Sequence, residues 1–237
     1  MRRLFTHAFQ PIVNTLSGTT YAHEALIRGL NGESAYHVLS GCTNDSIDAL
    51  DRDSGLRAIA LAAQLGMSSC LSINARPRSV EGEAHAAALA HAALACGFPI
   101  HNLILEVTED EAIADVAQFI DAVSSYRRIR VQIAIDDFGA GHSGLNLLAD
   151  FQPDLLKLDM NLVRNIASRG PRQAIVRAIL QVCEDLGIEV IAEGVETMSE
   201  YAWFSDHGVS LFQGYLFAVP GYEGLPAPVF PQLVSAA

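Results

Sequence analysis

Positive charge is scarce in this sequence of 237 residues. Lysine and arginine total 15 against 27 aspartate and glutamate residues, which gives a formal net charge of −12. Such a chain would repel the phosphates of a nucleic-acid polymer, so we expect no polymer of this kind as a partner. A small phosphate ligand is compatible with this charge where metal ions reverse the local sign.

Cysteines are also few, and the four are widely separated, at Cys42, Cys70, Cys96 and Cys183. The absence of a close pair argues against a zinc cluster, and the eight histidines lack the spacing of metal ligands. No apolar run approaches the roughly 20 residues that span a bilayer, and none long enough for a signal peptide follows residues 1–3. We therefore expect a cytoplasmic protein with reduced thiols and no membrane insertion.

Hydrophobic residues make up half of the chain and charged residues only 18%, which indicates a large buried core. Short apolar runs typical of strands alternate with longer amphipathic runs typical of helices. Strands are predicted near residues 5–13, 20–27, 70–75, 102–108, 130–137, 155–160, 189–194 and 211–217. Helices are predicted near residues 45–65, 79–95, 111–126, 171–187 and 197–207, with a short one near 144–150.

The order of these runs predicts the topology. No helix separates the first two strands, so we expect a hairpin with its turn at Ser17 and Gly18. From residue 45 onward helices and strands alternate, which demands parallel strands joined by right-handed crossovers. Eight strands suit a closed α/β barrel better than an open sheet, although periodicity alone does not decide between them. We expect residues 1–237 to form a single domain.

Polar residues interrupt several predicted strands near their C-terminal ends. Side chains alternate between the two faces of a strand, so apolar residues can face a helix layer while polar ones face inward. The pattern assigns inward positions to Ser72, Asn74, Glu106, Asp136, Lys157 and Asp159. Barrel interiors are packed, so inward carboxylates belong at the mouth of the barrel.

Five carboxylates fall at that end of four or five different strands: Glu24, Glu106, Asp136, Asp137 and Glu193. Converging carboxylates would repel one another unless cations were present. Oxygen ligands without histidine or cysteine select Mg²⁺, Mn²⁺ or Ca²⁺ rather than zinc, and adjacent aspartates are suited to bridging two ions. A single strand-end glutamate is more often a salt bridge or a helix cap, but the shared placement favours a metal site.

Two neighbouring features have simpler alternatives. Lys157 could be no more than a counterion to Asp159, and the residue pattern alone leaves that open. Gln213 and Gly214 could mark only a kink in a strand.

Six short motifs, in this order along the chain, resemble those of the EAL family. They are EALIR at residues 24–28, LEVTE at 105–109, DDFGAG at 136–141, LKLD at 156–159, AEGVE at 192–196 and FQGY at 212–215. The resemblance runs from Gln10 to about Pro220. It implies a modified (βα)₈ barrel with an antiparallel first strand, and hydrolysis of cyclic di-GMP to linear pGpG. It also implies two Mg²⁺ or Mn²⁺ ions, inhibition by Ca²⁺, and a homodimer.

By matching position, the resemblance assigns roles to individual residues. The implied metal ligands are Glu24, Asn74, Glu106, Asp136, Asp137 and Glu193. Lys157 would contact the attacking water, Asp159 would support it, and Glu193 would act as ligand, general base or both. The implied substrate contacts are Arg28, Gln213 and Gln10, and Glu109 would anchor the loop that carries Asp137.

Two departures from the family pattern stand out. Residues 38–49 carry nothing like the F-I-P-x-A-E segment of many members, and Ala75 and Arg76 follow Asn74 where many have x-Ser. No cyclase or sensor domain accompanies the barrel, so regulation comes from a partner or the chain is part of a longer protein. The rival hypotheses are a catalytically inert cyclic di-GMP receptor and a barrel lyase that uses magnesium.

Overall fold

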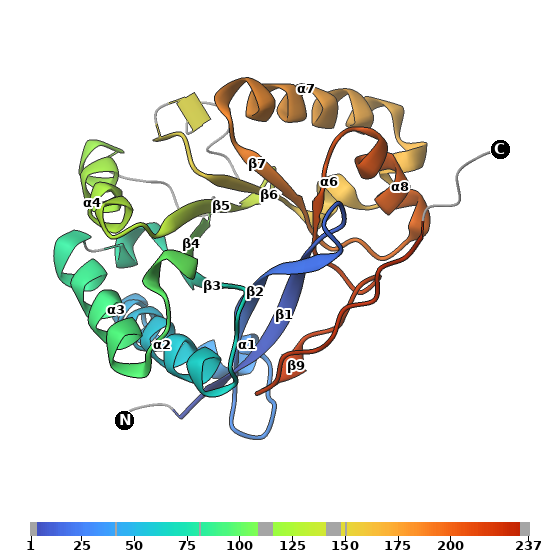
Figure 1. Ribbon diagram of the computed structural model, residues 1–237. Helices are drawn as coiled ribbons and strands as arrows, with labels where there is room; N and C mark the ends of the chain where they lie inside the picture. The colour runs from blue at the N-terminus through green and yellow to red at the C-terminus, as the bar shows by residue number, and fades with distance from the viewer. Residues whose placement is uncertain are drawn as a thin grey trace.

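Eight strands close into a barrel at the centre of the molecule (Figure 1). The computed structural model describes residues 4–40, 42–80, 82–108, 116–140, 148–149 and 151–232. The strands are β1 (Thr6–Asn14), β2 (Thr19–Arg28), β3 (Cys70–Ala75), β4 (Leu103–Thr108), β5 (Gln132–Phe138), β6 (Leu155–Leu158), β7 (Glu189–Ala192) and β8 (Leu211–Phe212). Each strand pairs with the next, and β8 pairs back with β1.

The first strand runs against the others. β1 is antiparallel to both β2 and β8, whereas β2 to β8 are mutually parallel. This confirms the predicted α/β barrel with an antiparallel first strand. A short strand that was not predicted, β9 (Gly221–Tyr222), pairs with β1 at Ala8 and Phe9. Turn residues 15–18 join β1 to β2, and Gly18 has a φ of 66°, so the expected hairpin is present.

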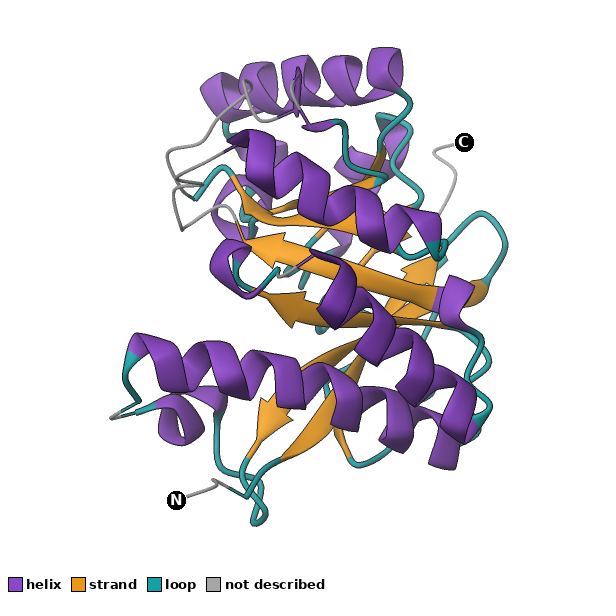
Figure 2. Cartoon of the chain, turned by 90° about the vertical axis from the view of Figure 1, so that its left-hand side faces the viewer, coloured by secondary structure: helices purple, strands orange, loops and turns teal. Residues whose placement is uncertain are grey.

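Helices cover the outer face of the strands, as the side view in Figure 2 shows. They are α1 (Ala35–Leu39), α2 (Asn44–Gln64), α3 (Gly82–Cys96), α4 (Val116–Arg128), α6 (Met160–Val163), α7 (Gly170–Leu186) and α8 (Met198–Asp206). Among the described residues, the short 3₁₀ turns η1 (Pro77–Ser79) and η2 (Ile100–Asn102) join strands to helices, and η3 (Ile166–Ser168) joins α6 to α7. Within the described ranges, no helix is long and apolar enough to cross a membrane.

The barrel interior is filled by one apolar layer with a polar layer directly above it. The apolar layer consists of Ile12, Ala22, Ile104, Ala134, Leu155, Ile191 and Leu211. Six of these apolar residues come from parallel strands, and each is followed two positions later by a polar residue. The polar residues are Glu24, Glu106, Asp136, Lys157, Glu193 and Gln213. Because strand side chains alternate, a step of two keeps the direction and moves one layer toward the C-terminal end. In antiparallel β1 the order reverses, and Gln10 precedes Ile12.

Three predicted strands run past their observed ends, and one of them, β7, ends at Ala192 rather than near residue 194. β6 ends at Leu158 because Asp159 caps α6, with its Oδ1 accepting from the Asn161 backbone N–H at 2.9 Å. β8 ends at Phe212, since the chain turns at Gly214 against residue 195. A Cβ on Gly214 would lie 2.0 Å from the carbonyl oxygen of Val195, so only glycine fits there.

Two predicted helices fall partly or almost wholly outside the described residues. The one expected near 111–126 is described from Val116 onward, as α4. The one expected near 144–150 is described only at residues 148–149.

Candidate metal centre at the barrel mouth

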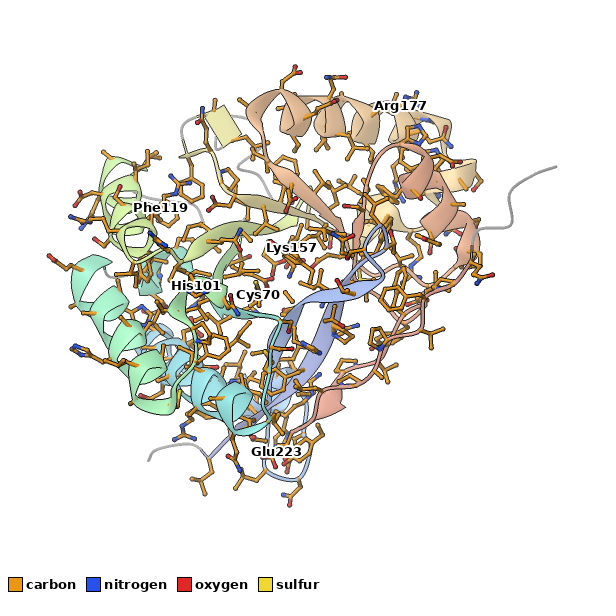
Figure 3. The ribbon with its side chains drawn as sticks, in the orientation of Figure 1. Cys70, His101, Phe119, Lys157, Arg177 and Glu223 are labelled. Carbon is orange, nitrogen blue, oxygen red and sulfur yellow. The ribbon has the colours of Figure 1, made fainter. Side chains whose placement is uncertain are left out.

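Lys157 lies at the centre of the site. It projects from β6 into the middle of the barrel, where Figure 3 labels it, and is 1% exposed. Its Nζ lies 2.6 Å from Glu193 Oε1, 2.8 Å from Glu106 Oε2, 2.9 Å from Asp136 Oδ1 and 3.5 Å from Glu24 Oε2. One ammonium group thus contacts carboxylates from β2, β4, β5 and the end of β7.

The ion pairs leave an excess of negative charge. Four carboxylates face one ammonium, so three negative charges stay uncompensated when all are ionised. Burial, reinforced by the charges of Glu24 and Asp136, raises the pKa of Glu106 to about 8 although Lys157 opposes the change. Burial and the same kind of repulsion also raise the pKa of Glu193 well above its ordinary value. A divalent cation would relieve this repulsion.

Lys157 itself keeps its proton. Burial acts to lower the pKa of its ammonium, but the surrounding carboxylates, led by Asp136 and Glu106, raise the pKa well above its ordinary value. Lys157 is therefore a fixed positive charge and a hydrogen-bond donor. A group with this proton affinity does not serve as a general base near neutral pH.

Amide side chains hold the Glu24 carboxylate from both sides. Asn74 Nδ2 donates to Glu24 Oε1 at 2.9 Å, and Gln213 Nε2 donates to Glu24 Oε2 at 2.7 Å. Although burial acts in the opposite direction, Lys157 and these two hydrogen bonds lower the pKa of Glu24. Gln213 also reaches Gln10 Oε1 at 3.4 Å, so the predicted substrate contacts Gln10 and Gln213 lie directly beside a predicted metal ligand.

A distortion of β5 brings two consecutive aspartates to one site. Neighbouring residues of a regular strand point to opposite faces. Here Asp137 has a φ of 54°, and the pairing of β5 with β6 shifts register between Ile135 and Phe138. Asp136, Asp137 and Glu193 consequently offer oxygen atoms that all lie within 4.8 Å of one another.

These residues fit divalent cations. A second group with the same 4.8 Å spacing consists of Glu24, Glu106 and Asp136, so Asp136 belongs to both. The donors are carboxylate oxygens, which hard cations such as Mg²⁺ and Mn²⁺ prefer. Gln213 Oε1 is also buried and accepts no hydrogen bond from the residues described here. The two groups share Asp136, and each brings together the oxygen ligands that a divalent cation takes.

Three other predicted site residues have different surroundings. Arg28 lies at the end of β2 on the Glu24 face, and its side chain donates to the Ile27 carbonyl at 2.8 Å. Asp159 Oδ1 accepts from both nitrogens of Asn161, and within the described chain Asp159 forms no ion pair with Lys157. Glu109 lies outside the described residues.

Sequence reasoning gave no role to Ser72, which contacts the site directly. Ser72 is fully buried on β3, and its Oγ donates to Glu106 Oε1 at 2.5 Å. Strand alternation placed Ser72 inward together with Asn74, which was the available signal. The identity of its partner depends on how β3 and β4 pair, which a single sequence does not specify.

The two departures from the family pattern meet in the structure. Arg76, which follows the last residue of β3, bonds to Asp48 and lies 3.2 Å from Asp51 on α2. Ser79 donates to the same two carboxylates, at 3.3 and 3.1 Å. Ion pairs and hydrogen bonds to carboxylates therefore connect the segment that lacks the F-I-P-x-A-E pattern to the residues that follow Asn74.

Comparisons with known proteins agree with this arrangement. The EAL domain family matches residues 2–220. The antirepressor BluF of Escherichia coli, regulated by blue light and temperature, is 36% identical over 228 residues, covering 95% of this chain and 56% of BluF. The cyclic di-GMP phosphodiesterase NbdA of Pseudomonas aeruginosa is 34% identical over 230 residues, covering 90% of this chain and 28% of NbdA.

A solved structure is similar over nearly its full length. The standalone versatile EAL protein of Vibrio cholerae, in its c-di-GMP-bound form, is 46% identical in sequence to this chain. The two structures superimpose with a TM-score of 0.92, and the match covers 97% of each chain. By contrast, the chain spans about half of BluF and less of NbdA. With a family match over nearly all of its length, this chain belongs to the EAL domain family.

Proposed function

We propose that this chain hydrolyses cyclic di-GMP to linear pGpG with the help of two Mg²⁺ or Mn²⁺ ions. The observation that carries the proposal is the pair of carboxylate groups joined through Asp136 around the buried Lys157. Relatives support the substrate, since NbdA is a cyclic di-GMP phosphodiesterase and the Vibrio cholerae protein binds c-di-GMP.

The proposed ligands of the two ions are Glu24, Asn74, Glu106, Asp136, Asp137 and Glu193. Two divalent ions supply two things to phosphodiester hydrolysis: activation of a water molecule and neutralisation of phosphate charge. The ligands come from β2, β3, β4 and β5 and from the residue after β7, so the closed sheet fixes where their backbone lies. Such preorganised groups need little rearrangement during the reaction.

Lys157 supplies the fixed positive charge of the proposed mechanism. Its Nζ is fully buried among the carboxylates and keeps its proton. It therefore donates a hydrogen bond to the attacking water and offsets negative charge that develops on the phosphoryl oxygens. Asp159 caps α6 directly after β6, so we assign it the positioning of the segment that follows Lys157.

The remaining proposed roles concern the substrate. Arg28 lies on the Glu24 face of β2, beyond the carboxylates, where its guanidinium can turn toward a substrate phosphate. Gln10 and Gln213 form the floor beside Glu24. Glu193 contacts Lys157 and belongs to one carboxylate group, so we assign it to metal binding, and its raised pKa also suits proton transfer.

A catalytically inert receptor for cyclic di-GMP is the second candidate. BluF, at 36% identity, is an antirepressor, so the family includes proteins named for a regulatory role. A receptor would bind cyclic di-GMP without converting it. The two carboxylate groups contain five of the six matching positions for metal ligands, and the sixth, Asn74, lies beside Glu24, which favours the enzyme.

One incubation separates the two candidates. The protein is mixed with cyclic di-GMP and Mn²⁺, and the products are resolved by chromatography. We expect pGpG to accumulate in proportion to enzyme, and to be absent with excess chelator or with Glu24→Gln. Saturable binding of cyclic di-GMP with Mn²⁺ present but without pGpG would overturn the enzyme and favour the receptor.

We further propose a cytoplasmic setting and a homodimer regulated by a partner or a further domain. All four cysteines are free thiols, which suits a reducing compartment. The net charge of −12 disfavours a nucleic-acid polymer as the partner. A solution mass near 25.4 kDa, that of one chain, at micromolar concentration would contradict the dimer.

A further inference from the structure

Ser72 is a buried hydroxyl that the proposed mechanism leaves without a role. It lies on β3, is 0% exposed and stands in register with Glu24 on β2 and Ile104 on β4. This register places Ser72 one layer below Asn74, inside the barrel. Its Oγ lies 2.5 Å from Glu106 Oε1, a short hydrogen bond of the kind that a hydroxyl makes to a carboxylate.

Glu106 receives one donor on each of its two oxygens. Ser72 donates to Oε1 at 2.5 Å and Lys157 donates to Oε2 at 2.8 Å. The terminal torsion of a glutamate side chain is broad, so the side chain alone does not fix the plane of its carboxylate. Two donors from β3 and β6 do fix it. Each carboxylate oxygen has two lone pairs, so each keeps one that can bind a cation.

We propose that Ser72 is a positioning residue of the cation site, which orients the Glu106 carboxylate for metal binding. The proposal deepens the proposed function in that the same carboxylates hold the cations, but it does not depend on what is hydrolysed. Partners behind metal ligands fix the orientation of those ligands, and their loss typically lowers metal affinity about 10–100-fold.

The test measures Mn²⁺ binding by titration calorimetry with no cyclic di-GMP present. Ser72→Ala removes only the hydroxyl oxygen and is compatible with the backbone of β3. We expect its dissociation constant for Mn²⁺ to rise about 10-fold. Ser72→Thr keeps the hydroxyl that donates to Glu106. Its dissociation constant for Mn²⁺ should therefore stay within about 3-fold of that of the unmodified protein.

Ser79→Ala is the matched control. Ser79 is 1% exposed and its hydroxyl also contacts carboxylates, the partly exposed ones of Asp48 and Asp51, which belong to neither carboxylate group of the site. Removing either hydroxyl leaves a carboxylate short of one donor and should reduce stability, by less in Ser79→Ala because Asp48 and Asp51 are partly exposed and keep Arg76 as a partner. Only Ser72→Ala should weaken Mn²⁺ binding.

A second comparison guards against poor folding of the threonine variant. In a Glu106→Gln background the carboxylate to be oriented is gone, so adding Ser72→Ala should change Mn²⁺ affinity by less than about 2-fold. An effect as large as that in the unmodified protein would show that Ser72 acts through another group and would overturn the proposal.

The remaining outcomes are distinct. Unchanged Mn²⁺ affinity in Ser72→Ala, or equal weakening in Ser72→Ala and Ser79→Ala, refutes the positioning role while leaving hydrolysis intact. A 10-fold loss of affinity in a protein that yields no pGpG supports the positioning role and refutes only the proposed function. Absence of saturable Mn²⁺ binding in the unmodified protein overturns both.

Discussion

Replacing Lys157 by methionine separates a catalytic lysine from a mere counterion. The side chain is 1% exposed and its Nζ contacts four carboxylates within 3.5 Å. Methionine preserves most of the volume and removes the charge. If Lys157 only balances charge, bound metal ions compensate and turnover per folded molecule stays near its original value. If it also orients water and offsets transition-state charge, turnover falls.

We expect the second result, with a magnitude set by comparable preorganised donors. Loss of one such donor lowers turnover about 10²–10³-fold, or roughly 3–4 kcal/mol of transition-state stabilisation. Removing one partner of a buried ion pair can also cost about 3–5 kcal/mol of stability, so the fraction of folded protein must be measured separately. The KM should change much less than the turnover, because the metal ligands and Arg28 remain.

The assay is pGpG formation at saturating Mn²⁺ and cyclic di-GMP, normalised to folded protein from circular dichroism. Arg164→Met is the matched control, because Arg164 pairs with Glu196 at 2.6 Å outside the two carboxylate groups. An exposed pair of this kind contributes about 0–1 kcal/mol, and we expect no effect on turnover. Turnover of folded, metal-loaded Lys157→Met within a few-fold of the original would refute the catalytic role.

Three further predictions test other parts of the structure. Replacing Mn²⁺ by Ca²⁺ should preserve metal binding but stop pGpG formation, because Ca²⁺ takes more ligands at longer distances; equal rates would contradict the metal assignment. Gly214→Ala should lower the free energy of unfolding by about 1–3 kcal/mol and reduce turnover, because its Cβ would lie 2.0 Å from the Val195 carbonyl oxygen; unchanged urea midpoint and activity would refute this reasoning. Burial, with Arg57 and Arg28 nearby, lowers the pKa of His7 from 6.5 to about 4, so between these values the unfolded chain binds a proton that the folded chain does not. Stability should therefore fall as pH drops from 6.5 toward 4, by roughly 2 kcal/mol at pH 5 relative to His7→Gln, and identical pH profiles of the two proteins would exclude this contribution.

Strand periodicity explains why much of the polar layer could be predicted. Glu106, Asp136 and Lys157 each stand two residues after an apolar residue of the barrel interior. This step is a local property of a strand and is visible in a single sequence. The closed barrel then brings the strand ends together. The alternation also gave the correct direction for Ser72, although it gave no reason to assign that residue a role.

The features that could not be predicted depend on geometry across the barrel or on local distortion. The sequence placed both Asp136 and Asp137 at the barrel mouth, but it did not reveal the φ of 54° at Asp137 or the register shift of β5 that bring the two together, since regular alternation sends neighbours to opposite faces. Lys157 was weighed as a counterion to Asp159, its neighbour on the same strand face. Its partners instead come from other strands, while Asp159 caps α6.

The polar layer also argues against a purely structural cluster of ion pairs. Desolvation makes buried ion pairs weak sources of stability, and well-packed apolar side chains of similar volume are often as stabilising or more so. The layer directly below the polar one in this barrel is filled by apolar side chains, among them Ile104, Leu155 and Ile191. A cluster serving only stability would also be balanced in charge, whereas Lys157 faces four carboxylates here. The excess negative charge and the distorted backbone at Asp137 are what a site for divalent cations requires, and both would be costs without function in a barrel that only had to fold.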